Sequence, residues 1–131
     1  SEAIDSALNQ TYPNIEVVVV DDGSSDNSRQ VIASYGEKIV PVLKENGGQG
    51  SACNAGFAIS KGEIVIFLDS DDILLPEIVQ HVVNAFKSDT NVVKVQYRLQ
   101  IMDANGQITD FTVPSRHWHM PSGDIREQLL K

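Results

Sequence analysis

The chain has 131 residues, of which 41% are hydrophobic and 21% are charged, a balance typical of a globular protein rather than a disordered one. Its 18 Asp and Glu outnumber its 10 Lys and Arg, and the formal net charge at pH 7 is -8. A negative charge this large repels phosphate backbones and disfavours binding to nucleic acid through a basic surface. The single cysteine, Cys53, excludes an internal disulfide and a cysteine-rich zinc site, and it indicates a reducing compartment.

The first 60 residues alternate between helix and strand patterns. Residues 15–20 are nearly all apolar and rich in β-branched side chains, which predicts a strand buried on both faces. The small polar residues 21–26 then form a turn and cap a helix that runs to about Tyr35, where Gly36 ends it. The predicted elements are a helix over 2–10, strands over 15–20 and 39–44, the helix ending at Tyr35, and a helix over 51–60.

Another apolar strand pattern opens the second half of the chain. Residues 63–68 predict a buried strand that ends directly in the acidic turn 69–72. A helix with Pro76 in its first turn then runs to about Lys87, and its apolar residues recur at helical spacing. The residues that this helix is expected to bury are Ile78, Val79, Val82, Val83 and Phe86.

The end of the chain is predicted to hold a hairpin, a loop and a helix start. Residues 92–102 and 107–113 predict two strands, and the Asn-Gly pair between them is typical of a hairpin turn. A loop around His117 and His119 follows, and then the start of a helix over 123–131. These two histidines have no third protein ligand nearby in the sequence, so no zinc site is expected there.

The order of these elements predicts an α/β fold with a mostly parallel sheet flanked by helices over the first 90 residues. Right-handed crossovers place all strand-to-helix loops at the same edge of such a sheet. The acidic turn at Asp21 and Asp22, the glycine loop 46–50 and the acidic turn 69–72 each follow a predicted strand. We therefore expect all three loops to meet at the carboxyl edge, where open α/β sheets bind ligands.

The turn after the third predicted strand carries three carboxylates, those of Asp69, Asp71 and Asp72. Neighbouring carboxylates repel one another, and one of them protonates unless a cation or hydrogen-bond donors compensate the charge. A divalent Mg²⁺ or Mn²⁺ ion, with ligand phosphates on its other side, provides that compensation. The alternative is that these residues only cap the next helix and lie in solvent.

The other two loops have alternatives of the same kind. Asp21 and Asp22 either cap the following helix, favoured by its dipole, or accept hydrogen bonds from a base N–H or a ribose hydroxyl. The glycines at 47, 48 and 50 let a ligand approach the backbone closely, and the next helix offers its amides to anionic groups. The loop matches neither the P-loop nor the dinucleotide-binding pattern.

Three blocks of this sequence resemble the family 2 glycosyltransferases, in the order expected for that family. They are residues 3–24, ending in Val-Val-Val-Val-Asp-Asp-Gly-Ser, residues 46–56, Asn-Gly-Gly-Gln-Gly-Ser-Ala-Cys-Asn-Ala-Gly, and residues 61–72, Lys-Gly-Glu-Ile-Val-Ile-Phe-Leu-Asp-Ser-Asp-Asp. The resemblance implies a GT-A fold that binds a nucleotide-diphosphate sugar, often a UDP-sugar. It also implies one partial domain, with residues 1–90 as the nucleotide-sugar-binding α/β part and 91–131 as the start of the acceptor part.

The resemblance also assigns roles to four residues. Asp69, Ser70 and Asp71 match the family's D-x-D motif, so Asp71 is expected to take a Mg²⁺ or Mn²⁺ ion that bridges the diphosphate. Asp69 is then expected near the ribose or the sugar, and Asp22, or else Asp21, against the base. The family inverts the anomeric carbon, because an acceptor hydroxyl, deprotonated by a general base, displaces the nucleotide in one step.

Two departures from the family pattern shape the expectations. Many members carry Arg where this chain has Cys53, so a cation facing the diphosphate is either missing or supplied elsewhere. In the sequence, the family's first strand is expected before Ser1. In the sheet, it is expected between the strands that end at Asp21 and Asp69. The family's acceptor half, with the catalytic acid, is expected after Lys131. We therefore assign no catalytic residue, expect this chain to be inactive by itself, and expect homo-oligomers through unpaired sheet edges.

Two other functions fit parts of the sequence. A phospho-accepting receiver domain would use Asp21, Asp22 and Asp69 with Mg²⁺, but it leaves the glycine loop unexplained. A module that binds a nucleotide-sugar without catalysis is the other alternative. The glycosyltransferase interpretation implies a carbohydrate or lipid-linked acceptor, no nucleic acid, and a role in polysaccharide biosynthesis. It also implies a cytoplasmic location and leaves open a peripheral attachment to the inner face of a membrane.

Overall fold

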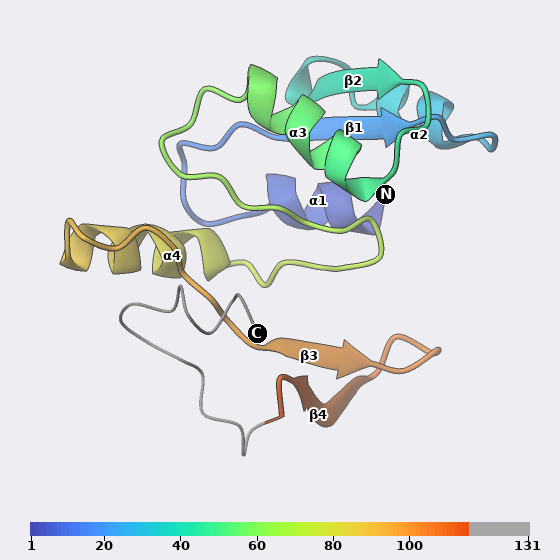
Figure 1. Ribbon diagram of the computed structural model, residues 1–131. Helices are drawn as coiled ribbons and strands as arrows, with labels where there is room; N and C mark the ends of the chain where they lie inside the picture. The colour runs from blue at the N-terminus through green and yellow to red at the C-terminus, as the bar shows by residue number, and fades with distance from the viewer. Residues whose placement is uncertain (116–131) are drawn as a thin grey trace. The chain divides into compact units, whose positions relative to one another are not determined.

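The structure is a computed structural model and describes residues 1–115 (Figure 1). The chain divides into two compact units, Ser1–Val93 and Lys94–Lys131. The first unit contains α1 (Glu2–Leu8), β1 (Val18–Asp22), α2 (Ser28–Ser34), a 3-10 turn (Gly36–Lys38), β2 (Val40–Lys44), α3 (Gln49–Ile59) and α4 (Ile78–Ser88). The second unit contains β3 (Leu99–Met102) and β4 (Ile108–Val113). The predicted loop at 117–119 and helix start at 123–131 lie outside the described residues.

β1 and β2 form a parallel pair, as the alternation of strand and helix patterns predicted. The register runs from Val18 opposite Val40 to Asp22 opposite Lys44, and α2 lies in the connection between the two strands. Both strands therefore end in a charged residue at the same edge of the sheet. This confirms the α/β class with parallel strands flanked by helices, although the pair is the whole of the sheet in the described part of the first unit.

α3 packs against β1, and a glycine makes the approach possible (Figure 1). A β-carbon added at Gly56 would lie 3.1 Å from Cγ2 of Val20, which is tighter than an ordinary carbon–carbon contact. Replacing Gly56 with valine is therefore expected to destabilise the fold by about 1–3 kcal/mol through overpacking. Urea unfolding measures this free energy.

The matched control is Gly50, which lies in the same helix with nothing within 4 Å of an added β-carbon. Replacing Gly50 with alanine is expected to stabilise the protein by about 0.5–1 kcal/mol, because alanine loses less backbone entropy than glycine on folding into a helix. Equal destabilisation at the two positions would contradict the packing of α3 on β1.

The predicted strand over 63–68 does not form, and this prediction is wrong. Residues 64–68 are not in a strand, and their backbone groups make no hydrogen bond within residues 1–115. Ile64, Ile66 and Leu68 are half-buried, whereas Val65 and Phe67 are 36% and 59% exposed, the alternation typical of an extended chain. An extended apolar segment becomes a strand only when a neighbouring strand pairs with it, and neither β1 nor β2 does so.

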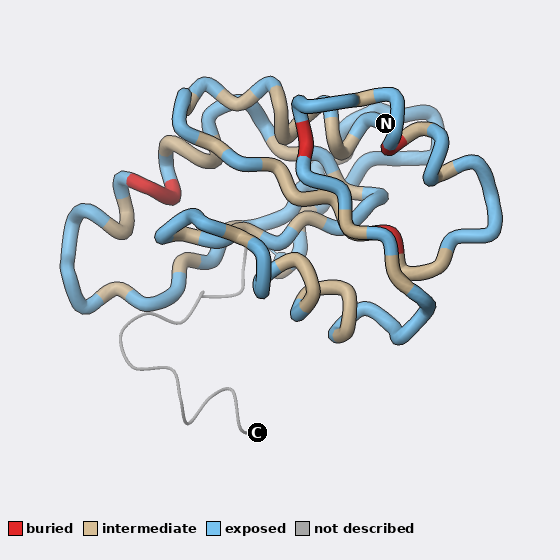
Figure 2. The backbone as a smooth tube through the Cα atoms, turned by 90° about the horizontal axis from the view of Figure 1, so that it is seen from above, coloured by how far each residue is buried: buried red, intermediate tan, exposed pale blue. Residues whose placement is uncertain are grey.

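A cavity of about 780 Å³ lies between β1 and residues 64–68. The first strand was predicted to be buried on both faces, and this prediction is also wrong. Val18, Val19 and Val20 are only half-buried, because the cavity lies beside them. Among the described residues, the buried hydrophobic side chains are those of Ile32, Ile39, Val82 and Val83 (Figure 2). None of these four side chains belongs to β1, so this strand contributes little to the hydrophobic core of the first unit.

α4 is held to the N-terminal segment by the side chain of Gln10. Its Nε2 donates to the carbonyl oxygens of Ser6 (3.0 Å) and Leu75 (2.9 Å), and its Oε1 accepts from the amide of Val79 (3.1 Å). α4 buries Val82 and Val83, while the other three predicted core residues of this helix are half-buried.

Replacing Gln10 with alanine is expected to destabilise the fold by about 1–2 kcal/mol, since it removes three hydrogen bonds, two of them to the entry of α4. Gln80 is the control, because within residues 1–115 its side chain donates only to Asn84 Oδ1, one turn along α4. Replacing Gln80 with alanine is expected to cost less than about 0.5 kcal/mol. Chemical unfolding compares the two variants, and equal losses would contradict this role of Gln10.

The second unit is an antiparallel hairpin, as the Asn-Gly pair predicted, but its first strand covers only Leu99–Met102 and not the predicted 92–102. Leu99 lies opposite Val113 and Met102 opposite Ile108, with an irregular register between them. In the turn, Asp103 Oδ1 accepts hydrogen bonds from the amides of Asn105 (2.8 Å) and Gln107 (2.9 Å). These hydrogen bonds to the backbone hold the pKa of the Asp103 carboxyl below its ordinary value.

Candidate functional site

The end of β1 and the glycine loop are joined by the carboxylate of Asp22. Its Oδ1 accepts a hydrogen bond from the amide of Gly47 (3.0 Å), and its Oδ2 accepts from Gly48 (2.7 Å) and also from Gly47 (3.1 Å). Lys44, the last residue of β2, forms an ion pair with the same carboxylate. Asp22 therefore binds both the neighbouring strand and the residues that lead into α3.

The acidic turn 69–72 is joined to the glycine loop by the first residue of α3. Nε2 of Gln49, the first residue of α3, donates to Oδ1 of Asp69 at 3.0 Å. Together with the contacts of Asp22, this hydrogen bond confirms that the loops at 21–22, 46–50 and 69–72 meet at one edge. The meeting was predicted from a third strand over 63–68, and it is found although that strand does not form.

Asp21 is only 3% exposed and lies against α2. Its Oδ2 accepts from Nε of Arg29 at 2.7 Å, and its Oδ1 accepts from the amide of Ser24 at 3.3 Å. Nη2 of Arg29 also donates to the carbonyl of Lys44 at 3.3 Å, so the guanidinium connects the ends of β1 and β2. The hydrogen bonds from Ser24 and Arg29 hold the pKa of Asp21 below its ordinary value.

Asp22 is ionised for a similar reason. The ammonium of Lys44, followed by the two amides of Gly47 and Gly48, favours the charged carboxylate and lowers the pKa of Asp22. The two aspartates at the end of β1 thus have different partners: Asp21 is bound to α2, and Asp22 to the glycine loop.

The acidic turn presents a more open set of oxygens. Asp69 and Asp71 are exposed, and the amide of Asp72 donates to the carbonyl of Asp69 at 3.1 Å, which closes the turn. The side chain of Asp71 makes no hydrogen bond or ion pair within residues 1–115. The described part of the chain has no group of three or more His, Cys, Asp and Glu side chains that could hold a metal ion.

These residues nevertheless fit Mg²⁺ or Mn²⁺ brought in with a phosphate ligand. Such an ion is usually held by one or two carboxylates, with waters and substrate phosphates completing the shell, rather than by a full set of protein ligands. Asp71 has both carboxylate oxygens free for that purpose, and Asp69 has one oxygen that accepts from Gln49 and one that does not.

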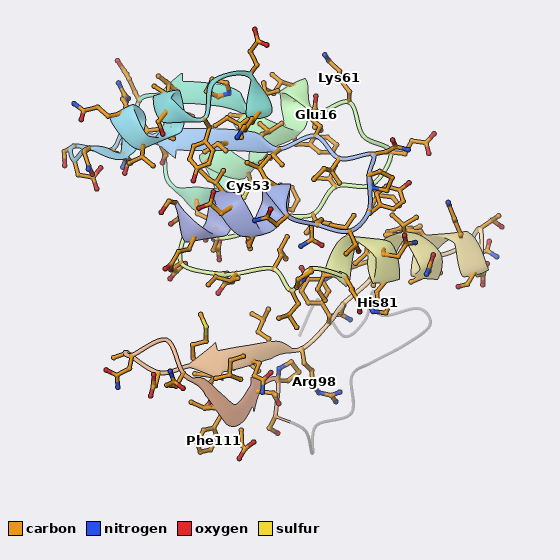
Figure 3. The ribbon with its side chains drawn as sticks, turned by 180° about the vertical axis from the view of Figure 1, so that it is seen from behind. Glu16, Cys53, Lys61, His81, Arg98 and Phe111 are labelled. Atoms are coloured by element: carbon orange, nitrogen blue, oxygen red, sulfur yellow. The ribbon has the colours of Figure 1, made fainter. Side chains whose placement is uncertain are left out.

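Sequence reasoning missed Lys44, Arg29 and Gln49, the three residues that connect the acidic ends of the strands. A signal for Lys44 was present, since a basic residue ending the second strand pairs naturally with an acid ending the first. Its partner could be chosen only once the register placed Lys44 opposite Asp22. Lys44 and Arg29 are the cations beside the end of β1, whereas Cys53 is half-buried in α3 and lines the cavity (Figure 3).

The fold is α/β, and its polar loops meet at the edge where open α/β sheets bind ligands. A model of the family described as Glycosyl transferase family 2 matches residues 1–130, and the chain belongs to this family. Together with the parallel strands and the hairpin, this match confirms the predicted family and a GT-A-like fold. None of the helices within residues 1–115 is long and apolar enough to cross a membrane.

The curated relatives are named as glycosyltransferases. The chain is 48% identical over 114 residues to an uncharacterized glycosyltransferase of Nostoc sp., covering 84% of this chain and 35% of the relative. It is 42% identical over 125 residues to one of Rickettsia typhi, covering 95% and 39%. It is 29% identical over 131 residues to the putative glycosyltransferase EpsH of Bacillus subtilis, covering 98% and 38%. The chain thus spans well under half the length of these relatives.

Proposed function

We propose that this chain is the nucleotide-sugar-binding part of an inverting glycosyltransferase that moves a sugar from a nucleotide-diphosphate sugar, with UDP-sugar as the expected donor, to an acceptor hydroxyl. The observation that supports it best is the joining of three loops at one edge. Asp22 binds the amides of Gly47 and Gly48, and Gln49 binds Asp69, so carboxylates and backbone amides lie together. Such an edge gathers carboxylate oxygens, which can accept hydrogen bonds from a base or a sugar.

The residues at this edge take distinct roles in the proposal. The carboxylate of Asp22, or that of Asp21, accepts a hydrogen bond from the base, and Asp69 lies near the ribose or the sugar. Asp71 holds Mg²⁺ or Mn²⁺, which neutralises the charge of the diphosphate leaving group when it is bound. A metal ion suits this chain, because its net charge of -8 opposes the approach of a free diphosphate.

The transfer step needs more than these residues. In an inverting displacement, the acceptor oxygen forms a bond to the anomeric carbon while the bond to the diphosphate oxygen breaks. The acceptor proton passes to a general base, and we assign that role to no residue of this chain. We therefore propose that the chain alone binds the donor without transferring the sugar, and that the acceptor is a carbohydrate or a lipid-linked sugar.

The metal assignment is tested by measuring the affinity for UDP with and without Mg²⁺ by titration calorimetry. Replacing Asp71 with asparagine is expected to lower the affinity in the presence of Mg²⁺ by about tenfold and to leave the metal-free affinity unchanged. Asp72, which is next in the chain, is the control, and its replacement by asparagine is expected to change the affinity by less than about threefold. An Asp71→Asn chain that gains as much from Mg²⁺ as the unmodified chain would contradict the assignment.

A further inference from the structure

The carboxylate of Asp22 is already filled by donors of this chain. A carboxylate offers about four sites at which it accepts hydrogen bonds. Oδ1 of Asp22 accepts from Nζ of Lys44 and from the amide of Gly47, and Oδ2 accepts from the amides of Gly47 and Gly48. A further donor, such as the N–H of a base, therefore binds Asp22 only if one of these three donors leaves.

The ammonium of Lys44 is the donor that can leave without moving the backbone. Gly47 and Gly48 donate through main-chain amides of the loop that leads into α3, whereas Lys44 donates from the end of a flexible side chain. The ammonium also has a second acceptor in the carbonyl oxygen of Glu45, at 2.6 Å. Lys44 is thus the donor that a base displaces from Asp22.

Displacement of Lys44 leaves a charge that needs a new partner. The side chains of Lys44 and Asp22 are only 23% and 19% exposed, so the ion pair is sheltered from water. A cation that loses its partner in such a place is destabilised unless another anion replaces it. A neutral base brings no anion, whereas a nucleoside diphosphate brings phosphate oxygens, which bind an ammonium strongly.

The position of the ammonium suits a phosphate partner. A β-carbon added at Gly47 would lie 3.1 Å from Nζ of Lys44, so the ammonium lies directly beside the glycine loop. Arg29, the other cation near the end of β1, is held by Asp21 at 2.7 Å and by the carbonyl of Lys44 at 3.3 Å. Of these two cations, Lys44 is the one that a base bound to Asp22 releases.

We infer that Lys44 is a specificity-determining residue that makes recognition of the base conditional on a phosphate. As the base takes its place on Asp22, the ammonium turns from Asp22 to the phosphates of the same ligand. Lys44 thereby favours a nucleoside diphosphate over the nucleoside alone. The inference rests on the proposed assignment of the base to Asp22 and adds Lys44, which has no role in that proposal.

The test compares the affinities for UDP and for uridine in buffer with Mg²⁺, measured by amide NMR titration at Gly47 and Gly48. In the Lys44→Met chain, Oδ1 of Asp22 is open to the base, and uridine is expected to bind about threefold more tightly. UDP is expected to bind about tenfold more weakly, because its phosphates lose a cation. The ratio of the UDP affinity to the uridine affinity is therefore expected to fall about 30-fold.

Three further variants separate this role from a general effect of charge or folding. Lys38→Met removes the same charge from an exposed residue before the start of β2, and it is expected to change the ratio by less than about twofold. Lys44→Arg keeps a cation and is expected to keep the ratio within about threefold. Lys44→Gln offers a donor to Asp22 without the charge, and it is expected to lower the ratio about tenfold through UDP alone.

The outcomes distinguish this inference from the proposed function. A folded Lys44→Met or Lys44→Gln chain that keeps the ratio of the unmodified chain would overturn the role of Lys44 and leave the nucleotide site standing. An unmodified chain that binds neither UDP nor uridine would contradict the proposed function, and the role of Lys44 with it.

Discussion

Replacing Gly23 with alanine is expected to destabilise the protein by about 3 kcal/mol, the largest loss among the substitutions considered. Gly23 follows β1 with a φ of +83°, a conformation that costs a residue with a β-carbon about 1–2 kcal/mol. The added carbon would also lie 2.7 Å from the backbone nitrogen of Asn46, so the glycine loop would have to move. Urea unfolding measures the loss.

The Gly36→Ala variant is the control that separates the cost of the positive φ from the cost of the close contact. It has a φ of +56° and nothing within 4 Å of an added β-carbon, so its replacement by alanine carries only the backbone cost, about 1–2 kcal/mol. The difference between the two variants measures the close approach of the turn at Gly23 to Asn46. If both variants lose the same stability, the glycine loop does not pack on the end of β1 as described.

Replacing Asp22 with alanine is expected to lower the affinity for UDP by at least about tenfold. The carboxylate of Asp22 holds the amides of Gly47 and Gly48 and the ammonium of Lys44, so its loss leaves all three without this partner. The glycine loop is then expected to lose its fixed position while the helices and strands persist. Calorimetry measures the affinity, and amide NMR spectra show whether the change is confined to the loop.

Asp22 also predicts a dependence of stability on pH. Because Lys44 and the two glycine amides favour the ionised carboxylate, its pKa is lower in the folded chain than the unfolded value of about 3.9. Such a group stabilises the fold above the unfolded pKa, and this contribution is lost as the pH falls through the folded pKa. The Asp22→Asn variant is therefore expected to lose less stability than the unmodified chain on acidification below about pH 4.

Asp110, an exposed residue of β4, is the control for the effect on UDP affinity. Replacing Asp110 with asparagine is expected to leave this affinity close to that of the unmodified chain. An Asp22→Asn chain whose acid unfolding follows that of the unmodified chain would show that the Asp22–Lys44 pair does not favour the folded state.

The sequence was most informative where structure depends on local pattern. Helical spacing placed α1 and α4, and the Asn-Gly pair placed the hairpin turn, all within a few residues. The sequence also predicted that Asp22, the glycine loop and Asp69 would come together, although the crossover rule was applied to a third strand that does not form.

The errors concern pairing between segments. Residues 63–68 have a strand composition, but a strand also needs a neighbour with free hydrogen-bonding groups, and none pairs with this segment in the described part. For the same reason Val18 to Val20 are half-buried instead of buried. The partners of the strand-end carboxylates, Lys44 and Arg29, depend on register, which sequence patterns alone did not determine. The ligand roles of Asp21, Asp22, Asp69 and Asp71 stay predictions.

The most direct test of the central claim is a two-dimensional amide NMR titration of this chain with UDP, with and without Mg²⁺. The account predicts shifts that depend on Mg²⁺ and are confined to the amides of residues 21–23, 46–50 and 69–72. Well-dispersed spectra whose signals at these loops do not respond to UDP and Mg²⁺, or respond no more than those of the hairpin, would contradict a nucleotide site at this edge.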